Sequence, residues 1–173
     1  MSRIEEMIAV GATISQAMHH LLTIERMRAW IAPDMALLPR GASPTLSPGD
    51  RFRLDALGGV VGFDYVVEAI TDREVVLSFD GPWTGSERWS FVADGAETIV
   101  RRAYDVADDS VAAWTAWNTL GRPLVLAHYK FELSRFREAV EREPGPKGEI
   151  EGRRESAQPA RRLEPLDFPV DEG

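Results

Sequence analysis

The sequence contains three histidines, the residue whose ordinary pKa lies closest to neutral pH. His19 and His20 are neighbours in a predicted helix, where adjacent side chains point about 100° apart and cannot easily share a metal ion. We therefore expect this pair at the surface. His128 interrupts an apolar stretch of the longest predicted helix. The ordinary interpretation is a partly buried, hydrogen-bonded histidine, and the alternative is a proton donor or acceptor in catalysis.

Two tyrosines and two arginines could present polar groups to a ligand. Tyr65 and Tyr104 lie in predicted strands, and Arg101 and Arg102 are adjacent in the second of these strands. An arginine facing inward would need a carboxylate partner, and Glu87 is a candidate because it shares a strand face with apolar residues. We favour the interpretation with both arginines on the outer surface. The pattern does not decide which of the two would otherwise face inward.

Five tryptophans are many for a chain of 173 residues. Trp30 and Trp89 are expected to fill the core. Trp83 follows a Gly–Pro turn, and Trp114 and Trp117 precede the longest helix. If a cavity lies between that helix and the predicted strands, all three tryptophans would be near its mouth. Exposed tryptophans there would favour contact with a ligand or a partner protein.

Several classes of function are disfavoured by the composition. The chain has no cysteine, and it carries a formal net charge of −8, which argues against a nucleic-acid-binding surface. The common catalytic motifs for nucleophilic serine, nucleotide and zinc sites are absent. We expect no metal and no cofactor. No apolar run reaches the roughly 20 residues that span a bilayer, and the first residues do not resemble a signal peptide, so a cytoplasmic location is expected.

The segment Arg122–Arg142 must position His128. Its apolar residues recur at spacings of three and four, which places them on one face of a helix. These residues are Leu126, Tyr129, Leu133, Phe136 and Val140. The first half carries a wider apolar surface, with Leu124 and Val125, and we expect this half to face a cavity.

A helix of this length needs a large apolar partner, and the period changes to two from Asp50 onward. Five strands are predicted: Arg51–Leu57, Val60–Ile70, Glu74–Asp80, Gly85–Ala93 and Glu97–Val106. Short turns connect them, so they form an antiparallel meander. An earlier strand, Arg3–Val10, is followed by two short helices that end at Leu22 and Trp30.

Three further segments complete the predicted organisation. Residues 32–49 hold four prolines and two glycines, which favours a lid or entrance loop with at most one short strand. Residues 108–119 are predicted to form a short helix. Residues 144–173 are rich in charge, Pro and Gly, and we expect a disordered tail after a domain at residues 1–143.

This order of elements resembles the START-like (SRPBCC) superfamily, including its polyketide cyclase/dehydrase and heat-shock-ATPase-activator-homologue groups. The motifs that carry the resemblance are the helix pair Ala17–Trp30, Pro48-Gly49-Asp50, Tyr65–Ala69, Trp89-Ser90-Phe91, Asp94–Thr98, and Glu132-Leu133 with Phe136. Ile24 stands where the family usually has proline, and Gly11-Ala12-Thr13 replaces the usual Ala-Pro. The resemblance implies an α+β helix-grip fold, in which a curved antiparallel sheet wraps around the long C-terminal helix and two short helices follow the first strand.

The resemblance also implies an apolar cavity between sheet and helix. The residues predicted to contact a ligand are Trp30, Phe52, Leu54, Phe63, Tyr65, Phe79, Trp83, Trp89, Phe91, Trp114, Trp117, Leu124 and His128. The first predicted function is binding of a hydrophobic, lipid- or polyketide-like small molecule. The alternatives are a cyclase/dehydrase-type enzyme that uses His128 and Tyr65 for acid–base chemistry, and a protein-interaction module with a protein partner or a homodimer.

Overall fold

A seven-stranded antiparallel sheet forms most of the structure, a computed structural model that describes residues 2–107, 114–115 and 117–142. The strands are β1 (Ser2–Val10), β2 (Met35–Pro39), β3 (Arg51–Ala56), β4 (Val61–Ile70), β5 (Glu74–Asp80), β6 (Thr84–Asp94) and β7 (Glu97–Ala107). Their order in the sheet is β1-β7-β6-β5-β4-β3-β2. The predicted meander is confirmed, and β2 is a short strand inside the loop predicted at residues 32–49.

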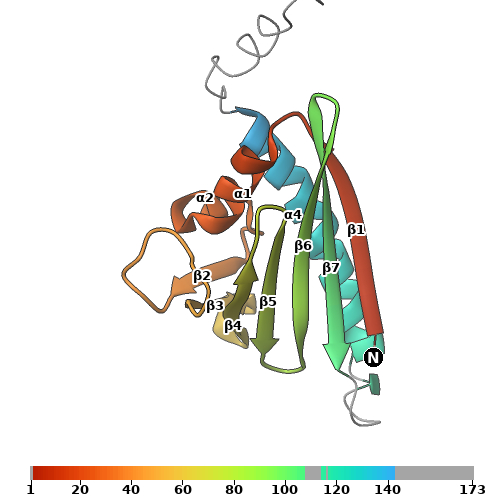
Figure 1. The fold of residues 1–173 in the computed structure, drawn as a ribbon. Helices are drawn as coiled ribbons and strands as arrows, with labels where there is room; N and C mark the ends of the chain where they lie inside the picture. Colours follow the sequence, from red (N-terminus) through yellow and green to blue (C-terminus); the bar gives the residue numbers. More distant parts are fainter. Residues whose placement is uncertain (1, 108–113, 116, 143–173) are drawn as a thin grey trace, which may run out of the picture. The chain divides into compact units, whose positions relative to one another are not determined.

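Three α-helices accompany the sheet among the described residues (Figure 1). They are α1 (Ile14–Leu22), α2 (Ile24–Trp30) and α4 (Arg122–Arg142), with a 3-10 turn, η1 (Leu57–Gly59), and a π-helical turn, η2 (Trp117–Gly121), directly before α4. α4 runs along one face of the sheet, and α1 and α2 contact it. The α+β helix-grip architecture is therefore as predicted.

Local sequence explains where α1 begins. The Thr13 side chain accepts a hydrogen bond from the Gln16 amide, and the Gln16 side chain accepts one from the Thr13 amide at 2.9 Å. This reciprocal pair is a capping box, which satisfies two backbone donors at the helix start. No described helix has a segment long and apolar enough to cross a membrane.

Two predictions lie wholly or partly outside the described residues. The helix predicted at residues 108–119 is described only in part, with residues 114 and 115 helical and η2 starting at Trp117. The domain boundary at residue 143 and the disordered tail at residues 144–173 stay predictions.

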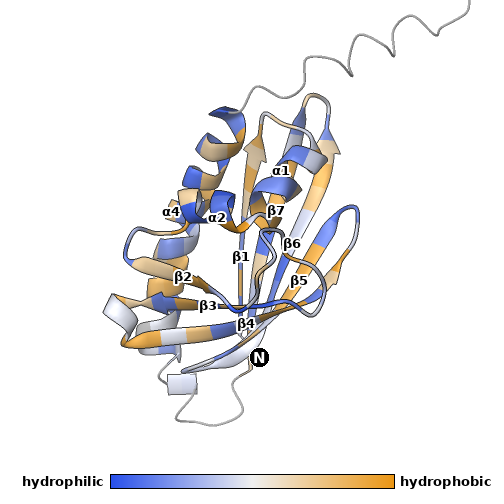
Figure 2. Cartoon of the chain, turned by 90° about the vertical axis from the view of Figure 1, so that its left-hand side faces the viewer, coloured by the Kyte–Doolittle hydropathy of each residue, from blue (hydrophilic) through white to orange (hydrophobic). Residues whose placement is uncertain are grey.

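Hydrophobic and hydrophilic residues alternate along the strands (Figure 2). Because successive side chains point to opposite faces of a sheet, the hydrophobic ones gather on the face that meets the helices. On β7 the buried residues are Thr98, Val100, Arg102, Tyr104 and Val106, together with Ala103. Arg102 is only 4% exposed, so the prediction that it lies on the outer surface is wrong. The same prediction is correct for Arg101, which is exposed and lies 3.5 Å from the Glu5 carboxylate.

The predicted surface position of the His19–His20 pair is wrong for His20, which is 5% exposed. The reason is helical spacing, because His20 lies three residues after Ala17 and next to Leu21 on the buried face of α1. Its Nε2 atom lies 3.0 Å from Nη1 of Arg26. His19 is exposed, as predicted.

Part of the core lies where the second half of α4 meets α2 and the sheet. Trp30, Trp89 and Phe136 contact one another there, with ring centroids 5.4–5.5 Å apart. Phe136 and Trp89 are fully buried, and Val140 is 1% exposed. This end of α4 fixes the helix on the sheet, which leaves its first half to form one wall of a cavity.

Candidate functional site

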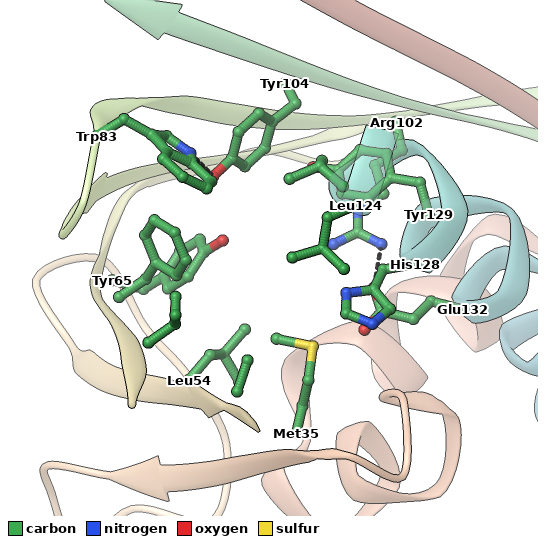
Figure 3. A pocket seen from close by; sticks show the side chains of 14 residues that line it. Met35, Leu54, Tyr65, Trp83, Arg102, Tyr104, Leu124, His128, Tyr129 and Glu132 are labelled. Carbon is green, nitrogen blue, oxygen red and sulfur yellow. Dashed lines mark hydrogen bonds and ion pairs between the residues drawn. The ribbon is translucent and has the colours of Figure 1, made fainter. Parts of the chain in front are cut away.

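A cavity lies between the first half of α4 and the ends of β2, β3, β4 and β7 (Figure 3). Its lining residues are Met35, Leu54, Ala56, Val61, Phe63, Tyr65, Trp83, Arg102, Tyr104, Leu124, Val125, His128, Tyr129 and Glu132. It offers about 50 Å³ to the centres of water-sized molecules. One water needs about 10–15 Å³ on this measure, so the cavity has room for a few water molecules.

A buried ion cluster lies at the floor of the cavity, where Arg102 and Glu132 line it. The third member of the cluster, Glu87, lines a second, smaller space. Arg102 donates from Nε to Oε1 of Glu87 at 2.7 Å and from Nη1 to Oε2 of Glu132 at 2.6 Å. The three side chains are 3–5% exposed. The guanidinium lies between two aromatic rings, 3.6 Å from the centroid of Tyr129 and 4.6 Å from that of Trp89. The cluster thus joins β6, β7 and α4 through charge-assisted hydrogen bonds.

The two carboxylates are held by further donors. Glu87 accepts hydrogen bonds from Nε1 of Trp89 at 2.6 Å and from the Tyr65 hydroxyl at 3.3 Å. Oε1 of Glu132 accepts the backbone N–H of Ala32 at 3.2 Å. Every carboxylate oxygen of the cluster therefore has at least one donor, which buried charges require.

Protonation in the cluster follows from burial and charge. Burial opposes the charged form of Arg102, but Glu87 and Glu132 outweigh it and raise the pKa of Arg102 well above its ordinary value. Burial raises the pKa values of Tyr65, Tyr104 and Tyr129 above their ordinary value. The arginine is therefore charged and the three tyrosines are neutral hydroxyl donors near neutral pH.

The tyrosine hydroxyls differ in their partners. The Tyr104 hydroxyl accepts a hydrogen bond from Nε1 of Trp83 at 3.1 Å. The Tyr129 hydroxyl is buried and has no hydrogen-bond partner among the described residues. An unpaired buried hydroxyl is unfavourable in a core, so a hydrogen bond from this group to a ligand or a water molecule would be stabilising.

His128 lies at the rim of the cavity, with 21% of its side chain exposed and Nε2 3.3 Å from Oδ2 of Asp34. Tyr65, the other residue predicted to be catalytic, lines the opposite side (Figure 3). The two side chains therefore face the same space from different walls, His128 from α4 and Tyr65 from β4. No group of three or more His, Cys, Asp or Glu side chains among the described residues is arranged to hold a metal ion.

The structure divides the predicted ligand-contacting residues into three sets. Leu54, Phe63, Tyr65, Trp83, Leu124 and His128 line the cavity. Trp30, Phe52 and Trp89, again with Leu54 and Tyr65, line a second space of about 20 Å³ on the other side of the ion cluster. Phe79, Phe91 and Trp117 are buried in the core, and Trp114 is 52% exposed; these four line neither space.

Arg102, Glu132 and Tyr129 are not among the ligand-contacting residues predicted from the sequence. A signal for Arg102 was present, because Val100, Tyr104 and Val106 are apolar at alternate positions and Arg102 falls between them. Glu132 lies three residues after Tyr129 and four before Phe136, which places it on the buried face of α4.

Comparisons with known proteins find similarity of structure only. No family model matches the sequence, and no curated protein matches it. The solved structures of similar fold include TTHA0849 from Thermus thermophilus, at 13% identity and a TM-score of 0.66, covering 80% of this chain and 97% of that one. The Aha1 dimer from Colwellia psychrerythraea matches at 18% identity and a TM-score of 0.63, covering 84% and 100%.

DynU16, a protein in the dynemicin biosynthetic locus, also matches, at 13% identity and a TM-score of 0.61. The match covers 82% of this chain but 48% of DynU16, so this chain spans about half the length of that protein. At these identities the likeness concerns the fold alone. The chain therefore has a START-like, or SRPBCC-like, fold.

Proposed function

We propose that this protein binds a small, largely apolar molecule in the cavity between the sheet and α4, with the polar end of the molecule at the ion cluster of Glu87, Arg102 and Glu132. The observation that carries the proposal is the position of this cluster: Arg102 and Glu132 lie buried at the floor of a largely apolar space, and Glu87 pairs with Arg102. Replacing a buried ion pair by well-packed apolar residues is often neutral or stabilising. A cluster of this kind is therefore better explained by recognition than by stability.

The lining supports the same proposal. Ligand sites are concave and mostly apolar, with a few placed polar groups. Here the apolar wall includes Leu54, Phe63 and Val125, and the polar groups come from the cluster, three tyrosines and His128. The size of the cavity favours a compact ligand, or a larger one whose first ring alone enters.

Two experiments test the proposal. Native mass spectrometry of the purified protein looks for a copurifying small molecule, and an NMR titration measures the binding of benzyl alcohol. Shifts of the backbone amides of Leu54, Tyr65 and Val125 are expected on titration. Ala56→Phe fills the space, because Ala56 is 4% exposed and lines the cavity, and should abolish these shifts. The matched control, Ala36→Phe on β2, is at an exposed position and should leave them unchanged. Equal shifts in the Ala56→Phe variant would reject the cavity as the binding site.

An enzyme of the cyclase/dehydrase type is the second candidate. The observation that favours it is the presence of hydrogen-bonded polar groups on both walls, His128 with Asp34 and Tyr65 with Glu87. Such pairs can donate and accept protons at a bound substrate. If His128→Ala binds the substrate but no longer turns it over, catalysis by His128 is supported. An unchanged turnover would show that His128 has no catalytic role.

The interaction module predicted as a third function draws less support from the described surface. Only Trp114 among the described tryptophans is exposed, and Trp117 is fully buried. The Aha1 protein from Colwellia psychrerythraea is described as a dimer, and a homodimer of this chain stays a prediction. Sedimentation of the purified chain tests it directly.

A further inference from the structure

We infer that the ligand carries a positive charge, as an ammonium group or a similar organic cation, at the end that reaches the ion cluster. This inference rests on the proposed function and specifies the chemistry of its ligand. It follows from the charge balance of the cluster, the charges at the rim and the aromatic walls.

The charge balance of the cluster is negative. Glu87 and Glu132 share a single guanidinium, so the buried cluster has one carboxylate more than it has cations. Arg102 is the only arginine or lysine among the described residues that line the cavity. An uncompensated charge out of water is unfavourable, and a hydrogen-bonded cation next to it offsets part of that penalty.

Charges at the rim do not correct the imbalance. Asp34 lies there, 48% exposed, with Oδ2 3.3 Å from the His128 ring. Even a positively charged His128 would balance only the negative charge of Asp34. The excess negative charge of the ion cluster at the floor would remain. A cationic ligand therefore meets a negative potential from the rim to the floor, whereas an anion is repelled by it.

The floor can accept hydrogen bonds from such a ligand. Glu132 lines the cavity, and its two oxygens accept one hydrogen bond each, from Ala32 and from Arg102. Each carboxylate oxygen can accept a second donor. The Tyr129 side chain also lines the cavity, and its buried hydroxyl has no partner among the described residues.

The walls suit a cation as well. Figure 3 shows Trp83, Tyr65 and Tyr104 on one side of the cavity and Arg102, His128 and Glu132 on the other. Aromatic faces attract cations, most strongly where water is excluded. A ring or short chain with an ammonium group would thus contact aromatic walls and reach the carboxylate of Glu132.

The test compares three probes of nearly equal size, benzylamine, benzyl alcohol and benzoate, by isothermal titration of the full chain near neutral pH. Benzylamine is then a cation, benzyl alcohol is neutral and benzoate is an anion. We expect benzylamine to bind at least about tenfold more tightly than benzyl alcohol, and benzoate to bind more weakly than either. Equal affinities, or tighter binding of benzoate, would overturn the inference while leaving the cavity as a binding site. Binding of none of the three would reject the proposed function as well.

A variant links the charge preference to the cluster. Glu132→Gln keeps the size of the side chain and removes its charge, so the affinity for benzylamine should fall to that for benzyl alcohol. Glu138→Gln, at an exposed position of α4, is the matched control and should leave both affinities unchanged. The probe series on the unmodified protein decides the question if Glu132→Gln does not fold, and a preference for benzylamine that persists in a folded Glu132→Gln protein would overturn the role of Glu132.

Discussion

The two halves of α4 meet the same sheet in different ways. In the second half, here called the packed half, Phe136 and Val140 are almost completely buried. Phe136 contacts the rings of Trp30 on α2 and Trp89 on β6. In the first half, the cavity half, Leu124 and His128 are partly exposed and line an incompletely filled space. Glu132 lies between the halves, bound to Arg102.

The difference separates stability from binding along one helix. Close-packed apolar side chains hold the packed half in place, so the space between the cavity half and the sheet can stay incompletely filled. Apolar residues can often replace a buried ion cluster without loss of stability, so packing alone does not explain the cluster at their boundary. Each of the following predictions tests this separation.

The largest expected effect is in the packed half. Phe136→Ala removes a fully buried ring and should lower the free energy of unfolding by about 4 kcal/mol, measured by urea denaturation. Leu124→Ala in the cavity half is the counterpart, and it should cost about 1 kcal/mol or less because Leu124 is 36% exposed. Similar losses in both variants would contradict the separation.

Breaking the cluster comes next. Arg102→Met leaves Glu87 and Glu132 buried without their cation and should lower the free energy of unfolding by about 3 kcal/mol. Adding Glu87→Gln and Glu132→Gln removes the two charges, and this triple variant should recover at least half of the loss. If the triple variant recovers none of the lost free energy of unfolding, the cluster stabilises the fold by contacts other than the pairing of its charges.

The third prediction concerns alkaline pH, because all three tyrosines of the chain line the cavity and burial raises their pKa values. In the unfolded chain a tyrosine loses its proton near pH 10, whereas the folded protein retains it to higher pH. Their contribution to stability is complete below about pH 10 and falls above it, by about 1.4 kcal/mol per pH unit for each tyrosine.

Tyr104→Phe should therefore reduce the slope of unfolding free energy against pH by about one third above about pH 10, measured by denaturation at a series of pH values. Val140→Ala, in the packed half, should lower stability without changing this slope. A slope unaffected by Tyr104→Phe would mean that Tyr104 titrates normally in the folded protein.

The smallest effect is expected at the rim. The contact between His128 and Asp34 is partly exposed, so His128→Ala should change the free energy of unfolding by no more than about 0.5 kcal/mol, measured by urea denaturation. A loss above about 2 kcal/mol would show that the rim, too, is part of the stabilising core.

Sequence patterns were sufficient for the elements of the fold. The period-two strands from Arg51 onward and the apolar face from Tyr129 to Val140 correspond to β3–β7 and α4. Both patterns are local, because each strand or helix buries one face. The resemblance then supplied their arrangement.

The site was predicted less well because its centre breaks the rule that charged residues are exposed. Arg102 is buried between Glu87 of β6 and Glu132 of α4. The sequence offered Glu87 as a partner for an inward-facing arginine, but Glu132 is 30 residues away and on another element. Trp117 was assigned to the cavity mouth by its position before α4, but its ring packs in the core against Trp83 and Tyr104. Such pairings depend on tertiary structure.

The position of α4 in the chain has a consequence for synthesis on the ribosome. β1 cannot complete the sheet until β7 is made, since Ser2 pairs with Val106, and α4 follows later still. At about 5–20 residues per second, the segment from Ala107 to Arg142 takes several seconds to translate. During that interval α4 does not yet cover the apolar face of the nascent sheet, and we expect the growing chain to be a substrate for chaperones until α4 emerges.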